Sequence, residues 1–175
     1  MYQERYDVIV VGSGPGGFPA AVAAARRGMK VLVLERNPFL GGLLASGLPL
    51  LAFIDRSGRQ VVKGFAEEFI IRLREVGGAT EHIPVPIQNS ITYVNMSWAR
   101  IMINEMLREE HVDTMVYAEL SEMLMEGDRV KGVKVFSRGE SYTFYTEPVI
   151  DGTGDASCAY KAGARCEKGE NLQPP

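Results

Sequence analysis

The residues Gly12-Ser-Gly-Pro-Gly-Gly17 have the spacing GxGxxG, which is suited to holding phosphates. In this spacing Gly12 permits a tight turn, Gly14 lets the backbone approach a pyrophosphate, and Gly17 lets a helix pack closely on a strand. The N-terminus of that helix presents free N–H groups and a partial positive charge, and Pro15 suits its first position. The pattern therefore predicts dinucleotide binding, with a structural turn that holds no ligand as the alternative.

A carboxylate follows at the distance expected for recognition of a ribose. Glu35 ends a second apolar run, 18 residues after Gly17. A carboxylate in that place can accept hydrogen bonds from the two hydroxyls of an adenosine ribose, and it would repel a 2′-phosphate, which argues against NADP. The alternative is a solvated acid at the end of a strand.

Short apolar runs and helical patterns supply the elements that would position these residues. Strands at 7–11 and 30–34 flank an alanine-rich helix at 18–27, and together they form a βαβ unit. The later elements expected are an amphipathic helix at 62–76, loop with a short strand at 79–96, a helix at 98–110 capped by Ser97, a parallel strand at 115–118, an antiparallel meander at 119–146, a parallel strand at 148–150 and a helix at 156–162.

Three features favour FAD over NAD as the dinucleotide. Residues 37–54 carry no charge for 18 residues and are rich in glycine and proline, as expected of a loop against a flat apolar ring. The glycines and prolines also argue against a membrane-spanning helix. A meander follows the third strand, and Thr153-Gly-Asp155 lies at the end of a parallel strand, where ligands bind in open α/β sheets. The predicted fold class is α/β: a Rossmann-like FAD-binding domain with a parallel sheet, helices and a three-stranded β-meander. An NAD-dependent dehydrogenase is the less favoured alternative.

Composition excludes several other classes. The net charge of −3 and the pI near 5.5 leave no basic patch for nucleic acid and no polybasic membrane signal. Cys158 and Cys166 form no CxxC or zinc motif and are expected to be reduced thiols of a cytoplasmic protein, with a redox pair or disulfide as the alternative. His82 and His111 stand in no metal motif and are expected at the surface or in loops, so no metal site is predicted.

Five further segments occur in an order typical of one flavoprotein family. They are Leu40-Gly-Gly-Leu-Leu-Ala-Ser-Gly-Leu48, Asp55-Arg-Ser-Gly-Arg-Gln60, Lys63-Gly-Phe-Ala-Glu-Glu68, Gly127-Asp-Arg-Val-Lys-Gly-Val133 and Val149-Ile-Asp-Gly-Thr-Gly-Asp155. With them the chain resembles, from Tyr6 to about Gly169, the FAD-dependent oxidoreductase family of the glutathione-reductase-like, two-dinucleotide-fold FAD superfamily. The first and last motifs of the chain are shared by many flavoproteins, whereas the middle ones are more specific to this family.

The resemblance implies roles for particular residues along FAD. The pyrophosphate would be held by Gly12, Ser13, Gly14, Pro15, Gly16 and Gly17. Glu35 would bind the ribose, Arg36 would lie beside the adenine, and the backbone near Leu120 would meet the adenine. The residues along the ribityl chain and the flavin would be Gly41, Gly42 and Ser46, and those that close the pocket would be Thr153, Gly154 and Asp155.

The sequence also departs from the family pattern in two ways. Phe18-Pro19 replaces small or aliphatic residues, and Pro19 removes one early helical hydrogen bond and is expected to bend the helix. Relatives continue into a substrate domain and return to the FAD domain, whereas this chain stops at Leu172-Gln-Pro-Pro175. Residues 1–175 are therefore expected to be an FAD-binding domain, truncated before the substrate domain and the C-terminal return.

These observations favour a flavoenzyme, or its N-terminal part, that moves a hydride or electrons between FAD and a small organic substrate. Neither a Ser/His/Asp set nor a CxxC pair is visible, so the sequence assigns no catalytic residue. The alternative is a non-catalytic FAD- or nucleotide-binding module that another chain completes. An apolar wall at Leu43, Leu44, Leu48, Leu50 and Leu51 is expected to be exposed and to favour a homo-oligomer or a completing chain.

Overall fold

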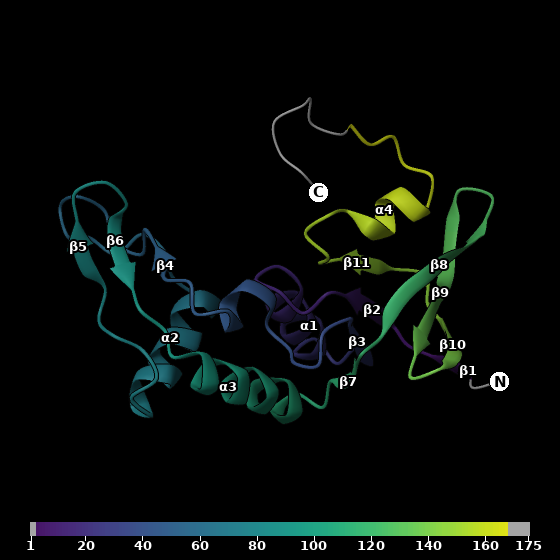
Figure 1. The fold of residues 1–175 in the computed structure, drawn as a ribbon, viewed down its shortest axis with the longest axis horizontal. Helices are drawn as coiled ribbons and strands as arrows, with labels where there is room; N and C mark the ends of the chain where they lie inside the picture. Colours follow the sequence, from purple (N-terminus) through teal and green to yellow (C-terminus); the bar gives the residue numbers. More distant parts are fainter. Residues whose placement is uncertain (1–2, 168–175) are drawn as a thin grey trace.

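The computed structural model describes residues 3–167, so the terminal segment Leu172–Pro175 discussed above lies outside the described residues. A parallel sheet occupies the middle of the molecule, with the longer helices on one side, and the meander and the short last helix on the other (Figure 1). The strands are β1 (Gln3–Arg5), β2 (Val8–Val11), β3 (Val31–Glu35), β4 (Leu50–Leu51), β5 (Ile83–Val85), β6 (Asn89–Thr92), β7 (Asp113–Val116), β8 (Glu119–Glu126), β9 (Arg129–Ser137), β10 (Glu140–Tyr145) and β11 (Val149–Asp151). The helices are α1 (Gly17–Ala25), η1 (a short 3-10 helix, Gly42–Ala45), α2 (Phe65–Glu75), α3 (Met96–Glu109) and α4 (Ser157–Lys161).

The central sheet confirms the predicted parallel strands. Its order is β11-β2-β3-β7, and all three pairings are parallel. β2 and β3 are short and fully buried because both of their faces are covered, which explains why their sequences are continuous apolar runs. The predicted α/β class with a Rossmann-like sheet is therefore confirmed.

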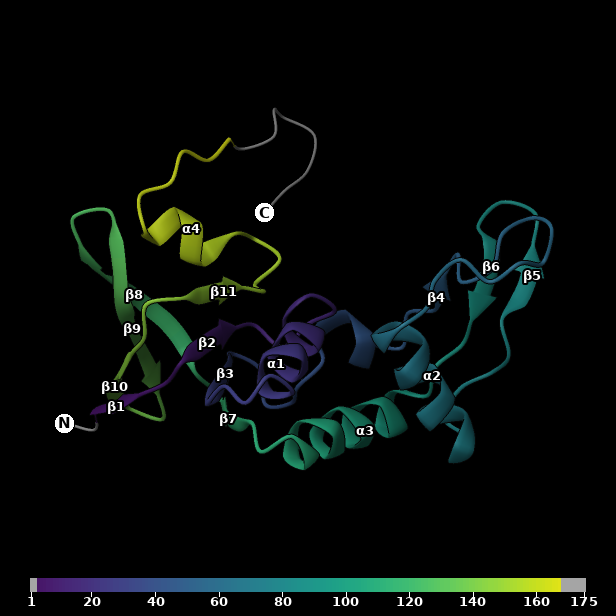
Figure 2. The ribbon, with the colours of Figure 1, turned by 180° about the vertical axis from the view of Figure 1, so that it is seen from behind.

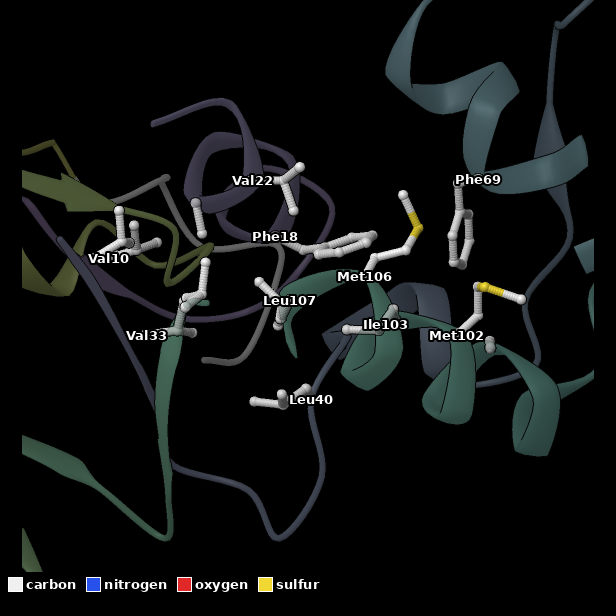
Figure 3. Close-up of a cluster of buried hydrophobic side chains, with 14 of the residues drawn as sticks. Val10, Phe18, Val22, Val33, Leu40, Phe69, Met102, Ile103, Met106 and Leu107 are labelled. Atoms are coloured by element: carbon white, nitrogen blue, oxygen red, sulfur yellow. The ribbon is translucent and has the colours of Figure 1, made fainter. Parts of the chain in front are cut away.

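The two faces of this sheet belong to two separate hydrophobic cores. Val8 and Val10 of β2 point toward the helices, whereas Ile9 and Val11 point toward the meander, as the two-residue period of a strand requires. On the helical side, Phe18 of α1 packs into the core that also holds Ile103 of α3 (Figure 3). This packing fixes the carboxyl ends of the strands relative to the turn that follows β2.

The predicted meander is present, and it gains one strand that the sequence did not indicate. β8, β9 and β10 pair antiparallel in sequence order, as expected. β1 adds to the edge of β10 in parallel and makes a four-stranded sheet. Because β1 has only three residues and a polar sequence, no periodicity distinguishes it from an irregular N-terminal segment.

The segment between α2 and α3 is more ordered than predicted. Instead of loop with one short strand, it contains β5 and β6, which join β4 in a three-stranded antiparallel sheet. This small sheet lies beyond α2 at the end of the molecule farthest from the meander, and α3 runs from that end back to β7 (Figures 1 and 2).

The amphipathic helices α2 and α3 form where expected, but the N-cap residue of α3 differs from the predicted one. Asn95 rather than Ser97 caps α3, because its side chain accepts hydrogen bonds from the Ser97 and Trp98 N–H groups at 3.0 and 3.1 Å. α1 runs unbroken through Pro19, and the flanking bonds from Phe18 N and Ala20 N are formed. Within residues 3–167, no helix is both long and apolar enough to cross a membrane.

His82 lies in a loop just before β5, as one of the two expectations had it, but it is not at the surface. Its side chain is only 9% exposed, stacks on Phe53 and joins β6 to α2. Nε2 lies 2.9 Å from the Glu67 carboxylate and Nδ1 lies 2.6 Å from the hydroxyl of buried Thr92. Because a carboxylate only accepts, Nε2 donates to Glu67, and Nδ1 shares a hydrogen bond with the Thr92 hydroxyl. His111, in contrast, is exposed, as expected.

We expect His82→Ala to lower the free energy of unfolding by about 1–3 kcal/mol, because the buried Thr92 hydroxyl loses its partner. Urea denaturation followed by circular dichroism measures the change. His111→Asn is the matched control: Asn tolerates the positive φ at that exposed position, and a change within about 0.5 kcal/mol is expected. Equal stability of the two variants would show that the His82 contacts contribute nothing.

Candidate functional site

A cleft of about 520 Å³ opens at the carboxyl ends of β2, β3 and β11. This size lies within the range of small-molecule sites, and the position is the one at which open parallel sheets bind ligands. Eleven of the fifteen residues singled out from the sequence line it: Gly12, Gly14, Pro15, Glu35, Arg36, Gly42, Ser46, Leu120, Thr153, Gly154 and Asp155. Segments from both halves of the chain therefore converge on one cleft.

The glycines of the turn after β2 have different surroundings. Gly12 has φ +90°, and a Cβ there would lie 2.5 Å from the Gly152 carbonyl oxygen. A Cβ on Gly17 would overlap the Gly12 carbonyl oxygen. A Cβ on Gly14 would instead point into the cleft, with its nearest neighbour, Gly152 O, 4.0 Å away. Gly12 and Gly17 are thus required by backbone packing, whereas Gly14 leaves room for a ligand.

Gly16 and Gly17 do not line the cleft, in contrast to the other glycines of the motif. Gly16 is the N-cap of α1, and a Cβ added there would have no neighbour within 4 Å, while Gly17 is buried against the turn. Both nevertheless place the N-terminus of α1 beside Gly14 and Pro15, which line the cleft. The partial positive charge of that helix end is therefore directed at the site.

Ser13 lies behind the cleft, and its hydrogen-bond donors face Glu35. The residue is fully buried, and its N–H and its hydroxyl both donate to Glu35 Oε2, at 3.0 and 2.5 Å. The Ser13 hydroxyl also accepts a hydrogen bond from Gly41 N at 3.0 Å. The Ser13 side chain thereby connects Glu35 to the loop that begins at Gly41.

The loop at 41–46 forms the next wall of the cleft. Gly42 and Ser46 line the cleft, whereas Gly41 is buried behind it, where a Cβ would lie 2.5 Å from Ile103 Cδ1. Arg100 of α3 supports this loop: its Nη2 donates to the Ala45 carbonyl at 3.2 Å, and its guanidinium lies 3.8 Å from the centre of the Phe39 ring. The loop is therefore fixed from behind by α3.

The last wall is the turn that follows β11. The Asp151 carboxylate accepts hydrogen bonds from Thr153 on one oxygen and from the Cys158 and Ala159 N–H groups on the other. Although burial alone raises the pKa of Asp151, the hydrogen bonds from Thr153, Ala159 and Cys158 outweigh it, and the net pKa is lowered. Asp151 is thereby hydrogen-bonded both to α4 and to Thr153, which lines the cleft.

We expect Asp151→Asn to lower the free energy of unfolding by about 1 kcal/mol at pH 7, because an amide cannot accept on both sides. Since the folded pKa of Asp151 is lowered, its contribution is complete above the ordinary Asp value of about 3.9 and is lost as the pH falls below it. Denaturation of both proteins at pH 7 and pH 3 checks this. A difference that persists unchanged at pH 3 would contradict an ionised acceptor.

The two cysteines are free, as predicted, and they differ in exposure. Cys158 is buried behind the turn, and burial, with a smaller contribution from the Asp151 charge, raises the pKa of its thiol to about 12. The Cys158 thiol therefore stays protonated near neutral pH and is no nucleophile.

Several residues of the cleft were not singled out from the sequence. Asn37 and Phe39 extend the wall that begins at Glu35, Gly152 forms the floor beneath Gly12, and Lys161 reaches the rim from α4. Of these residues, only Gly152 could have been identified from the sequence, because it belongs to the Asp-Gly-Thr-Gly-Asp segment. Asn37 follows Glu35 by two residues, but an isolated Asn is too common in loops to be assigned.

The unusual residues Phe18 and Pro19 line a second, smaller pocket. It has a volume of about 250 Å³ and lies between α1, α2 and the loop before α2. Pro15 is shared with the main cleft, and Phe18 contacts Phe65 and Phe69 of α2 edge to face. Phe18 thus fills space between two helices, which accounts for its size.

Comparisons with known proteins agree with this geometry. Over 159 residues the chain is 28% identical to digeranylgeranylglycerophospholipid reductase 2 of Methanococcoides burtonii, a match that covers 87% of this chain and 38% of the relative. It is 36% identical over 96 residues to a ferredoxin–NADP reductase of Leuconostoc citreum, a match that covers 55% of this chain and 27% of the relative. The chain thus spans well under half of either relative.

A solved structure, the flavin-dependent brominase Bmp2, shares the fold with a TM-score of 0.67 at 17% identity, over 91% of this chain and 40% of that chain. The profile of the family described as FAD dependent oxidoreductase matches residues 7–174. The cofactor of that family is FAD, and the open space in front of Gly14 fits the close approach that a pyrophosphate needs. The cleft and the glycine turn agree with this match, which shows that the chain belongs to the FAD dependent oxidoreductase family.

Proposed function

We propose that this chain supplies the FAD-binding part of an oxidoreductase that moves a hydride or electrons between FAD and a small organic substrate. The observation that carries the proposal is the convergence of Gly14, Glu35 and Thr153 on one cleft at the carboxyl ends of parallel strands. FAD supplies the redox chemistry when bound, and the protein positions it and excludes side reactions.

Each wall of the cleft has a separate part in this proposal. The turn at Gly12, Gly14 and Pro15 holds the pyrophosphate, together with the N-terminus of α1, and Glu35 binds the adenosine ribose. Arg36 and the backbone near Leu120 enclose the adenine. Gly42 and Ser46 follow the ribityl chain, with Gly41 supporting them from behind, and Thr153–Asp155 close the opposite side.

The absorption spectrum of the purified chain, together with turnover of an electron acceptor, tests the proposal. Visible flavin bands that persist through gel filtration, with reduction of an acceptor, are expected of an oxidoreductase. A bound flavin without turnover would favour the alternative, a nucleotide-binding module. A colourless protein that binds NAD but not FAD would contradict the proposal.

We expect Glu35→Gln to weaken FAD binding by about 1–3 kcal/mol, the typical effect of losing charge-assisted hydrogen bonds. The glutamine side chain also replaces one carboxylate oxygen by an NH₂ group. That donor would then face the N–H donor of either Ser13 or Asn37. Calorimetry with FAD and the cofactor-free protein measures the effect. An unchanged dissociation constant would exclude Glu35 from ribose recognition.

We further propose that another chain, or a second copy, covers the apolar surface beside the cleft. Leu43, Leu48 and Leu51 are 62%, 54% and 48% exposed. Leu44 and Leu50, expected in the same wall, are half-buried and pack on the helical core instead. Size-exclusion chromatography with light scattering tests the association, and a monomer at high concentration would exclude self-association.

A further inference from the structure

The carboxylate of Glu35 is already fully hydrogen-bonded within the protein. Oε2 accepts from the N–H and the hydroxyl of Ser13, at 3.0 and 2.5 Å. Oε1 accepts from the N–H and the side-chain amide of Asn37, at 2.9 and 2.8 Å. Because an ionised carboxylate offers about four lone-pair positions, these donors fill all of them. A ribose hydroxyl can therefore bind Glu35 only if one donor leaves.

These four donors differ greatly in their freedom to move. Two are backbone N–H groups fixed by the turn after β2 and by the end of β3. The Ser13 hydroxyl is fully buried and also accepts from Gly41 N, so its departure would break a second hydrogen bond. The Asn37 side chain is at an exposed position and lines the cleft. Its amide is thus the donor that can leave at the lowest cost.

We propose that the Asn37 side chain is a specificity-determining latch on Glu35. Without a ligand, the Asn37 amide donates to Oε1 of Glu35. When a nucleotide binds, the amide moves away, and a ribose hydroxyl at the adenosine end donates to Oε1 instead. The proposal rests on the proposed function, because it concerns the same ribose-binding carboxylate. The backbone of Asn37 stays in place during the exchange: its N–H keeps its bond to Oε1, and its carbonyl accepts from Tyr117 N at 3.2 Å.

A latch of this kind reduces nucleotide affinity in proportion to the fraction of time that it is open, because only the open state offers Oε1 to a ribose hydroxyl. A ligand with a ribose hydroxyl replaces the hydrogen bond from the Asn37 amide to Oε1 with one from its own hydroxyl. A ligand without this hydroxyl forms no hydrogen bond to Oε1. Removal of the amide should therefore strengthen the binding of a ribonucleotide, the opposite of the usual effect of deleting a polar residue from a binding site.

Calorimetry with the cofactor-free chain tests this, with ADP and 2′,3′-dideoxy-ADP as probes. We expect Asn37→Ala to bind ADP about three- to tenfold more tightly than the parent does, the range that the net free energy of one typical hydrogen bond gives. Binding of the dideoxy nucleotide should be unchanged, whereas a merely structural effect would change both. Asn37→Leu, which keeps the volume without the donor, should give the same gain.

Asn104→Ala is the matched control, since its amide donates to the Arg100 carbonyl on the exposed side of α3, and both affinities should stay at the parent's values. ADP binding that is unchanged or weaker in both Asn37 variants would overturn the latch while leaving the proposed function in place. Failure of the parent to bind either ADP or FAD would overturn the proposed function, and the latch with it.

Discussion

Replacing Gly14 with valine should abolish FAD binding while the fold survives. Gly14 lines the cleft, and a Cβ there meets only open space, with Gly152 O 4.0 Å away. The valine side chain therefore occupies the place that a pyrophosphate needs without displacing backbone. We expect the affinity for FAD to fall by roughly 100-fold or more. Flavin content after purification and calorimetry on the cofactor-free protein measure it.

Gly16→Ala is the control for this prediction. Gly16 lies two residues further along the same turn, does not line the cleft, and has no neighbour within 4 Å of the added Cβ. Flavin content and melting temperature should therefore stay close to those of the parent. Equal flavin content in the Gly14→Val variant and the parent would place the pyrophosphate elsewhere.

Of the substitutions proposed, Gly17→Ala should lower the free energy of unfolding most. Its Cβ would overlap the Gly12 carbonyl oxygen and lie 3.1 Å from Val10 Cγ1, and neither the turn nor β2 can move freely. Overpacking against backbone at the centre of the fold should lower the free energy of unfolding by about 4 kcal/mol or more. Urea denaturation followed by circular dichroism measures the loss. A cooperative transition at the parent's midpoint would mean that α1 can shift away from the sheet.

The sequence predicted the centre of the fold because local signals there are strong. β2 and β3 are buried on both faces, so their residues form uninterrupted apolar runs, and Glu35 stands where the second run ends. The meander was predictable because turns at Gly127 and Gly139 separate strands of clear composition. In each case a few neighbouring residues determine the element.

The remaining features depend on contacts between distant segments. β5 contains Pro84 and has only three residues, so its pairing with β6 gives no periodic signal. The burial of His82 depends on α2, which supplies Glu67 from a different element. Likewise, the inward orientation of Ser13 follows from its bonds to Glu35 and Gly41, which the GxGxxG spacing does not encode.

The close contact between Gly12 and Gly152 has a consequence for the order of events during synthesis. The two glycines are far apart in the sequence, and each would clash with the other if it carried a Cβ. A growing polypeptide carries the glycine turn after β2 long before it carries β11, so the cleft lacks a wall until β11 has left the ribosome. Closure of so long a loop is slow compared with local helix formation. Completion of the cleft thus follows the docking of β11 against β2.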